Sequence, residues 1–71
     1  MAGDTFEVEG EVTRCDRGGF YRVRLDNGHD VLARLSGKMY MGNIKVILTD
    51  RVRVELNAYS LDRGRIVYRY R

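Results

Sequence analysis

Apolar and polar residues alternate along most of this chain, which is the pattern of β-strands with one buried face. Over residues 6–13, apolar or small residues alternate with three glutamates and a threonine. Gly10 interrupts the apolar side, and its missing side chain predicts a bend or bulge in a long strand. Residues 20–25 alternate in the same way and place Arg22 and Arg24 on the outer face. The first 25 residues therefore predict two strands separated by a loop at Arg17-Gly18-Gly19.

A turn and a short helix follow. Asn27-Gly28 predicts a two-residue hairpin loop, because both residues tolerate the positive φ that such a loop requires. A third strand follows, with the apolar residues of 31–35 on one face. Ser36 then stands where a helix N-cap is expected, and Gly42-Asn43 marks the end of a helix over residues 36–41.

The second half of the chain predicts two more strands. The apolar run at residues 44–48 has no period that assigns it to a helix or a strand. Residues 52–56 alternate as a fourth strand, residues 57–64 read as a loop, and the remainder alternates as a fifth strand. Tyr68 shares a face with Ile66 in this reading, so it is expected in the core.

The predicted order is three strands, a helix and two strands. This is the order of elements in an all-β, five-stranded OB-fold, which is a Greek-key barrel with a short helix between strands three and four. An SH3-like or Sm-like barrel is the alternative, and the position of the helix favours the OB-fold. With 71 residues, the chain is long enough for one small core. We predict a single domain over residues 1–71, with residues 1–5 flexible.

Charge is segregated along the chain. Residues 1–30 contain seven acids and four arginines, whereas residues 31–71 contain nine lysines or arginines and three acids. This distribution favours a basic face that binds a polyanion over an evenly solvated surface. No apolar run is long enough to span a membrane, nothing resembles a targeting peptide, and the single Cys15 cannot form an internal disulfide. We expect a cytoplasmic monomer without a membrane partner.

Catalysis is not expected. His29 is the only histidine, and no cysteine or second histidine stands near it in the sequence, which makes it a poor metal or catalytic candidate. We therefore predict no catalytic residue, no metal and no cofactor. His29 lies at the hairpin tip, where a simple turn residue and an RNA-base contact are equally good readings.

Basic residues supply the candidate RNA contacts. Guanidinium and ammonium groups bind phosphate oxygens, and the counterions they displace add favourable entropy. Such contacts position an RNA without reading its sequence. The candidates on the helix and on the last loop and strand are Lys38, Arg63, Arg65, Arg69 and Arg71. The alternative for the last strand is a charged edge that prevents aggregation. Arg22 and Arg24 either extend the basic surface or are simply exposed to solvent on the outer face of the second strand.

Five segments together resemble one family. They are VEGEV at residues 8–12, DNGH at 26–29, LSGKM at 35–39, VRVEL at 52–56 and GRIVYR at 64–69. In this order and at this total length, the chain resembles bacterial translation initiation factor 1, a single OB-fold domain. The resemblance implies binding to the small ribosomal subunit in the aminoacyl-tRNA site, against ribosomal RNA and a ribosomal protein. It also implies that the protein blocks tRNA there and assists the other initiation factors.

The chain departs from the family after LSGKM. The family carries basic residues there, whereas Tyr40, Met41 and Gly42 follow here. Tyr40 is predicted to stack on RNA in place of the missing charge. Lys45 matches a position that is basic in the family, which makes it a further candidate RNA contact.

Two other functions remain open. A cold-shock-like chaperone of single-stranded RNA has the same barrel, but it needs more aromatic residues on strands two and three than this chain supplies. A protein-interaction barrel is the other alternative, with Met39, Tyr40 and Met41 as an apolar contact patch.

Overall fold

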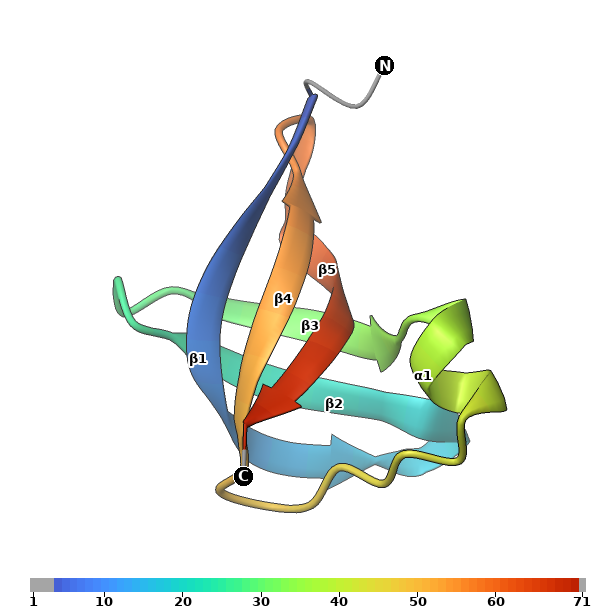
Figure 1. Cartoon of the computed structure of the whole chain (residues 1–71). Coiled ribbons are helices and arrows are strands. Elements are labelled where there is room, and N and C mark those ends of the chain that lie inside the picture. Colours follow the sequence, from blue (N-terminus) through green and yellow to red (C-terminus); the bar gives the residue numbers. More distant parts are fainter. Residues whose placement is uncertain (1–3, 71) are drawn as a thin grey trace.

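The computed structural model describes residues 4–70, and it contains five strands and one α-helix (Figure 1). In chain order the elements are β1 (Thr5–Asp16), a 3-10 turn (Arg17–Gly19), β2 (Phe20–Leu25), β3 (Asp30–Leu35), α1 (Gly37–Met41), β4 (Arg51–Asn57) and β5 (Ser60–Tyr70). The helix stands between β3 and β4, as the sequence predicts.

The strands form a closed barrel in the order β1-β2-β3-β5-β4. β3 and β5 pair in parallel, and every other neighbouring pair is antiparallel. Closure of the barrel leaves few exposed strand edges, which suits a chain with so small a core. The all-β OB-fold prediction is therefore confirmed.

β1 belongs to both sides of the barrel, and it crosses from one to the other at Gly10 and Glu11, which each pair with both β2 and β4. Gly10 pairs with Leu25 of β2 and also with Val52 of β4. A Cβ atom at Gly10 would lie 2.5 Å from the carbonyl oxygen of Arg24, closer than atoms can approach. The prediction that Gly10 permits a bend is consistent with this crossing. The register shift itself lies slightly further on, between Val12 and Arg14.

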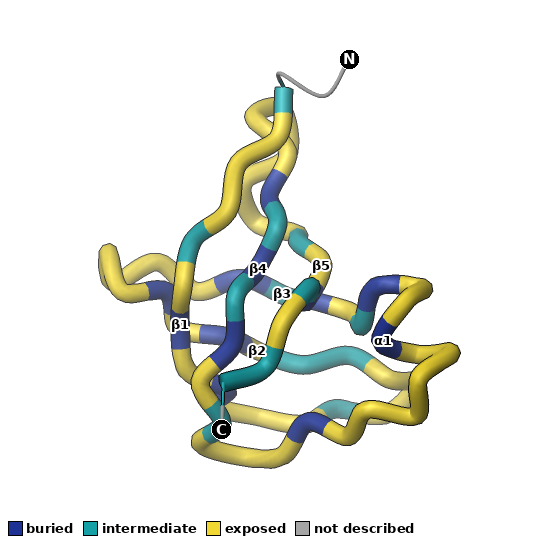
Figure 2. Tube along the Cα trace, viewed as in Figure 1, coloured by how far each residue is buried: buried dark blue, intermediate teal, exposed yellow. Residues whose placement is uncertain are grey.

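The core is built from the inward-facing residues of all five strands, together with one residue from α1 and one from the loop after it (Figure 2). Aliphatic side chains fill it: Val12, Val23, Leu25, Val31, Ala33, Met39, Val46, Val52, Val54, Leu56 and Ile66. Because side chains alternate along a strand, the residues between these positions face outward and are free to carry charge.

The β2–β3 turn differs from the predicted two-residue loop. The Gly28 N–H donates to the Leu25 carbonyl at 2.8 Å, and the Leu25 N–H donates to the His29 carbonyl at 2.7 Å. The loop therefore has three residues, and within it only Gly28 has a positive φ, at 89°. A tight turn followed by a left-handed glycine produces this three-residue form, so Asn27 does not need the strained conformation.

α1 begins where the sequence predicts. The Ser36 hydroxyl accepts the Met39 N–H at 3.2 Å, and the Ser36 N–H donates to the Ile66 carbonyl at 2.9 Å. The first bond caps the helix and the second ties its start to β5. The unassigned run at residues 44–48 is an irregular segment in which Val46 is buried in the core.

Two predictions about the last strand were wrong. The β4–β5 connection is only Ala58 and Tyr59, so β5 already begins at Ser60 instead of after residue 64. The register also shifts inside β5, because Arg53 pairs with Tyr68 while the next residue, Val54, pairs with Ile66. This bulge turns Tyr68 outward, with 52% of its surface exposed, instead of into the core.

At the N-terminal end, the predicted flexible segment falls on residues 1–3, which lie outside the described residues, and on Asp4 and Thr5. Thr5 pairs with Asn57 of β4. Within residues 4–70, no helix has the length and apolar character to cross a bilayer.

Candidate nucleic-acid interface

Five arginines lie on the outer wall formed by the end of β1 and by β2, β3 and β5. Strand register brings them together, because Arg14 lies opposite Arg22 and Arg34 lies beside Arg65. Arg63 completes the group, because it pairs with Leu32, the residue that also lies opposite Arg22. We call this set the arginine wall: Arg14, Arg22, Arg34, Arg63 and Arg65.

Like charges in direct cross-strand register destabilise a sheet, so this arrangement has a cost in the free protein. Arg14 is compensated by Asp16 at 2.7 Å, and Arg65 forms an ion pair with Glu55. Arg22 and Arg63 have no acidic partner within residues 4–70. An excess of positive charge held by strands at fixed spacing is what a phosphate backbone can neutralise.

Arg34 is held against an aromatic ring. Its guanidinium carbon lies 5.0 Å from the centroid of Phe20, the residue opposite it on β2. This cation–π contact fixes the side chain without removing its charge. The donor groups of Arg34 therefore stay available to a ligand.

The arginines of β4 are neutralised on the other side of the barrel. Arg51 donates to both carboxylate oxygens of Asp26, at 2.9 and 2.8 Å, and lies 3.6 Å from Glu9. The hydrogen bond from Arg51 lowers the pKa of Asp26 below its ordinary value. Arg53 lies 3.6 Å from Glu7. The arginine wall therefore carries excess positive charge, whereas the arginines of β4 are balanced by Asp26 and by the β1 glutamates Glu7 and Glu9.

A groove of about 600 Å³ borders the arginine wall. Arg34 and Arg65 lie on one side of it, and the rings of Tyr21 and Tyr40 also line it. Its remaining lining is Leu35 and four glycines, namely Gly18, Gly19, Gly37 and Gly64. Aromatic rings beside guanidinium groups can hold an unstacked nucleotide, because the rings stack on a base while the cations bind its phosphates.

The structure brings three of the predicted site residues to this region, and a fourth lies on the helix beside it. Arg63 and Arg65 belong to the arginine wall, and Tyr40 lines the groove with 74% of its surface exposed. Lys38 lies on α1, two residues before Tyr40, and is also exposed.

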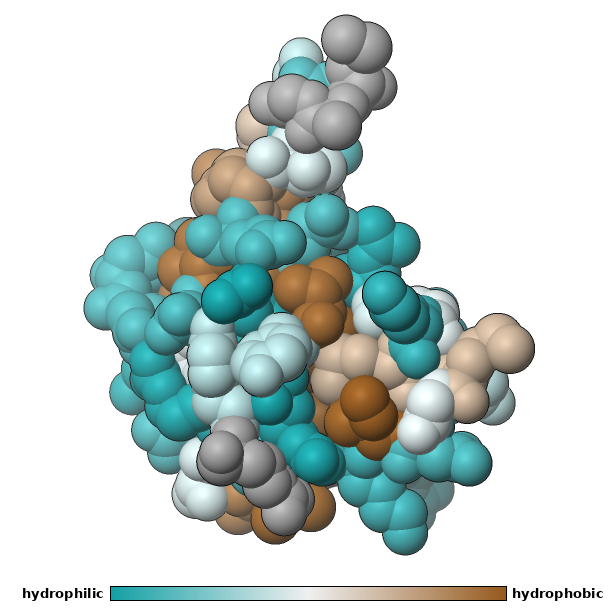
Figure 3. Space-filling view, in the orientation of Figure 1, coloured by the Kyte–Doolittle hydropathy of each residue, from teal (hydrophilic) through white to brown (hydrophobic). Residues whose placement is uncertain are grey.

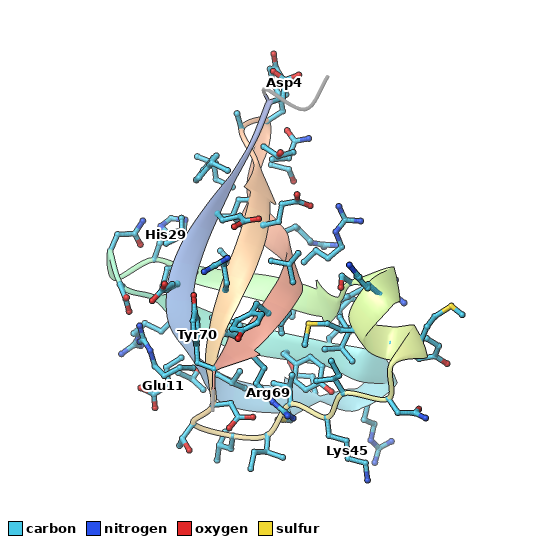
Figure 4. The ribbon with its side chains drawn as sticks, in the orientation of Figure 1. Asp4, Glu11, His29, Lys45, Arg69 and Tyr70 are labelled. Atoms are coloured by element: carbon cyan, nitrogen blue, oxygen red, sulfur yellow. The ribbon has the colours of Figure 1, made fainter. Side chains whose placement is uncertain are left out.

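The remaining predicted residues lie elsewhere. His29 precedes β3, at the opposite end of that strand from α1 (Figure 4). Six residues of strand separate the two by about 20 Å. The His29 backbone N–H donates to the Asn27 side chain at 2.9 Å, which is the role of a turn residue. Arg71 lies outside the described residues.

The Arg69 side chain is directed at the segment that follows α1. It pairs with Val52 on β4, and its guanidinium donates to the backbone carbonyl of Lys45 in the segment after α1 (Figure 4). Its Nε atom is buried and has no hydrogen-bond partner among residues 4–70. Arg69 therefore braces the 42–50 segment in the free protein, whereas the Lys45 side chain is exposed.

Sequence reasoning missed Arg14 and Arg34 and left Arg22 undecided. Alternation alone places Arg22 and Arg34 on outward faces, but the register that sets them beside other arginines comes from strand pairing. Within residues 4–70, no group of three His, Cys, Asp or Glu side chains is placed to hold a metal ion.

Comparison with known proteins supports an RNA-related role. The family model described as translation initiation factor 1A / IF-1 matches residues 2–71. The chain is also similar to the solution structure of translation initiation factor 1 from the Wolbachia endosymbiont strain TRS of Brugia malayi. That similarity has 40% identity and a TM-score of 0.80, and it covers 96% of this chain and 80% of the other.

A second solved structure shares the fold alone. It is YjeQ from Thermotoga maritima, with 22% identity and a TM-score of 0.75. The match covers 93% of this chain but only 23% of YjeQ, so the barrel corresponds to one part of that larger protein.

Proposed function

Since this chain belongs to the translation initiation factor 1A / IF-1 family and resembles the bacterial factor of that family, we propose that it binds the small ribosomal subunit at the aminoacyl-tRNA site. There it blocks tRNA and assists the other initiation factors. It acts as a cytoplasmic, monomeric binding protein without catalysis. Besides family membership, the observation that supports this proposal is the excess positive charge of the arginine wall, in which Arg22, Arg34 and Arg63 have no acidic partner within residues 4–70.

In this proposal the arginine wall contacts the phosphate backbone of ribosomal RNA. Arg22, Arg34 and Arg63 are the main contacts, because none of them is held by an acidic side chain within residues 4–70. Binding relieves the repulsion between neighbouring arginines, and the counterions released from the RNA add to the free energy. Phosphate contacts of this kind recognise a folded RNA by its shape.

The groove beside the wall supplies the second part of the contact. Tyr40 is placed to stack on an exposed base, and Lys38 adds a charge on the same helix. Stacking of one base on an aromatic side chain contributes about 1–3 kcal/mol. His29 and Arg71 remain proposed contacts at other positions, and Arg69 acts by holding the segment that carries Lys45.

Chemical footprinting of ribosomal RNA in isolated small subunits tests this proposal. We expect protection of the decoding site by the wild-type protein and loss of that protection with the triple variant Arg22→Gln, Arg34→Gln, Arg63→Gln. The matched control is the double variant Arg51→Gln, Arg53→Gln, which removes arginines that are already neutralised by carboxylates.

Two results would contradict the proposal. One is the absence of decoding-site protection by the wild-type protein. The other is equal affinity for the subunit and for an unstructured oligonucleotide, which would favour the single-stranded RNA chaperone instead.

A further inference from the structure

The N-terminal half of β1 is an open edge of the barrel. Over residues 5–9, β1 pairs with β4 alone, and its pairing with β2 starts only at Gly10. In Figure 1 this part of the strand stands above the β2–β3 turn, with β4 on one side of it. We call residues 5–9 the β1 edge. Within residues 4–70, no strand covers its second side.

Backbone groups on the β1 edge point away from β4. The Glu9 carbonyl accepts the Asp26 N–H at 2.9 Å, so the backbone of Glu9 faces the β2 side. Since successive residues of a paired strand direct their backbone groups to opposite sides, Glu7 faces the same side as Glu9. The N–H and the C=O of Glu7 have no backbone partner within residues 4–70. Groups of this kind on a strand edge are a template for an added strand.

The side chains of the β1 edge alternate in chemistry. Phe6 is 43% exposed and Val8 is half-buried against the core, so one face of the edge is apolar. Glu7 and Glu9 alternate with them, and their side chains are 47% and 48% exposed. In Figure 3, apolar and hydrophilic side chains lie next to one another in this upper part of the molecule. A strand added here therefore meets apolar groups on one face and carboxylates on the other.

Both glutamates have partners inside the barrel and still face solvent. Arg53 lies 3.6 Å from Glu7, and Arg51 lies 3.6 Å from Glu9. Glu9 also accepts the Tyr70 hydroxyl at 2.8 Å. An ionised carboxylate has about four acceptor sites, so these contacts leave room for further donors. A Lys or Arg side chain on an added strand can therefore bind the same carboxylates.

The charge of this strand argues against other occupants of the edge. The first 13 residues contain four acids and no Lys or Arg. RNA phosphates are repelled by these carboxylates. A second copy of the chain, paired antiparallel about Glu7, would place acid against acid, which destabilises a sheet. A basic segment of another protein meets neither conflict.

We propose that the β1 edge binds an extended segment of a partner protein, in which basic residues alternate with apolar ones, as an added strand. The apolar residues of the segment lie beside Phe6 and Val8, and its Lys or Arg residues lie beside Glu7 and Glu9. The arginine wall is formed by other strands and by the far end of β1, so both surfaces can be occupied together. This strand-docking site goes beyond the proposed function and does not depend on it.

NMR titration of the ¹⁵N-labelled full chain with three nine-residue synthetic peptides tests the proposal. The first peptide alternates Lys with Val and Phe, and the second replaces each Lys with Glu. The third has the sequence of the first, but its backbone nitrogens are methylated, so it cannot donate main-chain hydrogen bonds. We expect the first peptide to bind, and the other two to bind at least about tenfold more weakly, since each lacks one required feature.

Amide hydrogen exchange identifies the added strand. The Glu7 N–H should gain about tenfold protection or more when the first peptide binds, because it then donates to the peptide. The Val8 N–H should change little, since it faces β4 and is already paired. Attraction between charges alone would not protect one of these neighbouring amides and spare the other.

A charge reversal locates the site on the strand. Glu7→Lys should weaken binding of the first peptide about tenfold or more. Glu11→Lys is the matched control, because Glu11 is an exposed glutamate of the same strand at a position where β1 already pairs with both β2 and β4. The peptide experiment contains no RNA and no ribosomal component, so its failure would leave the proposed function untouched.

Four outcomes would overturn the docking site. The first is equal binding of the first peptide and either of the other two. The second is that the first peptide binds without protecting the Glu7 N–H, or does not bind. The third is protection of the Glu7 N–H by a poly(U) oligonucleotide, which would make this edge an RNA contact. The fourth is protection that rises with protein concentration in the absence of peptide, which would make it a contact between copies of this chain.

Discussion

Arg34 and Arg65 are 31 positions apart in the sequence but lie side by side in the parallel register of β3 and β5. Arg65 is compensated by Glu55 on the neighbouring strand β4, whereas Arg34 rests on the ring of Phe20. Two like charges so close together weaken the free protein slightly. They also form one edge of the groove that Tyr40 lines, so the same register creates both the cost and the candidate site.

The salt dependence of small-subunit binding should report the number of arginine contacts. For the triple variant Arg22→Gln, Arg34→Gln, Arg63→Gln, we expect the log–log slope of affinity against salt to become shallower by about 2.1–2.7, since each of the three lost phosphate contacts removes roughly 0.7–0.9. Binding assays over a range of potassium concentrations would measure this. An unchanged slope would show that these arginines do not contact phosphate, and Arg51→Gln, Arg53→Gln serves as the control.

Removal of one arginine from the wall should stabilise the free protein. We expect Arg22→Thr to raise the free energy of unfolding by about 0.2–1 kcal/mol at low salt, because it removes the repulsion with Arg14 and places a β-branched residue in a strand. The gain should shrink at high salt, where the repulsion is screened. Urea unfolding at two salt concentrations would measure both effects. A loss of stability at low salt would contradict the cost that we assign to the Arg14–Arg22 pair.

Gly10 should not tolerate a side chain. We expect Gly10→Ala to lower the free energy of unfolding by about 1–3 kcal/mol or more, because the new methyl group would meet the backbone of β2. Gly37→Ala is the control, since a Cβ atom there meets nothing within 4 Å and the position starts a helix. Thermal unfolding followed by circular dichroism compares the two. Equal melting temperatures for both variants would refute the close approach of β1 and β2.

The Asp26–Arg51 ion pair should make stability depend on pH in the acid range. The pKa of Asp26 is lowered in the folded protein, so its contribution is present above the unfolded value near 3.8 and is lost as pH falls through the lower folded value. We therefore expect Asp26→Asn to be less stable than wild type above about pH 4 and to approach it at lower pH. Urea unfolding between pH 2 and 7 would test this, with Asp30→Asn for comparison. A stability difference that stays constant over the whole range would contradict the linkage.

The order of elements could be predicted from the chain because each signal is local. Alternation with a period of two identified the strands, and Ser36 and Gly42 marked the ends of α1. Two of the three misplaced features also have local causes. A bulge at Val67 reverses the direction of Tyr68, and the turn at Asn27-Gly28 holds three residues instead of two. An alternating pattern does not reveal a bulge, because one extra residue shifts every later side chain without changing composition.

The site depended on contacts between distant segments. The basic character of residues 31–71 was visible in the sequence, but Arg51 is bound by Asp26 and Arg69 is directed at the Lys45 carbonyl. Alternation alone did not distinguish Arg22 and Arg34 from ordinary exposed residues. Strand pairing places both of them in the arginine wall.

The linear chain alone was sufficient for the fold class and the family, because short-range periodicity, capping residues and five ordered motifs carry that information. Closure of the barrel decided which arginines are neutralised by a carboxylate and which have no acidic partner. Electrostatic compensation depends on distance in space, and strand register places residues from opposite ends of the chain within a few ångströms of one another.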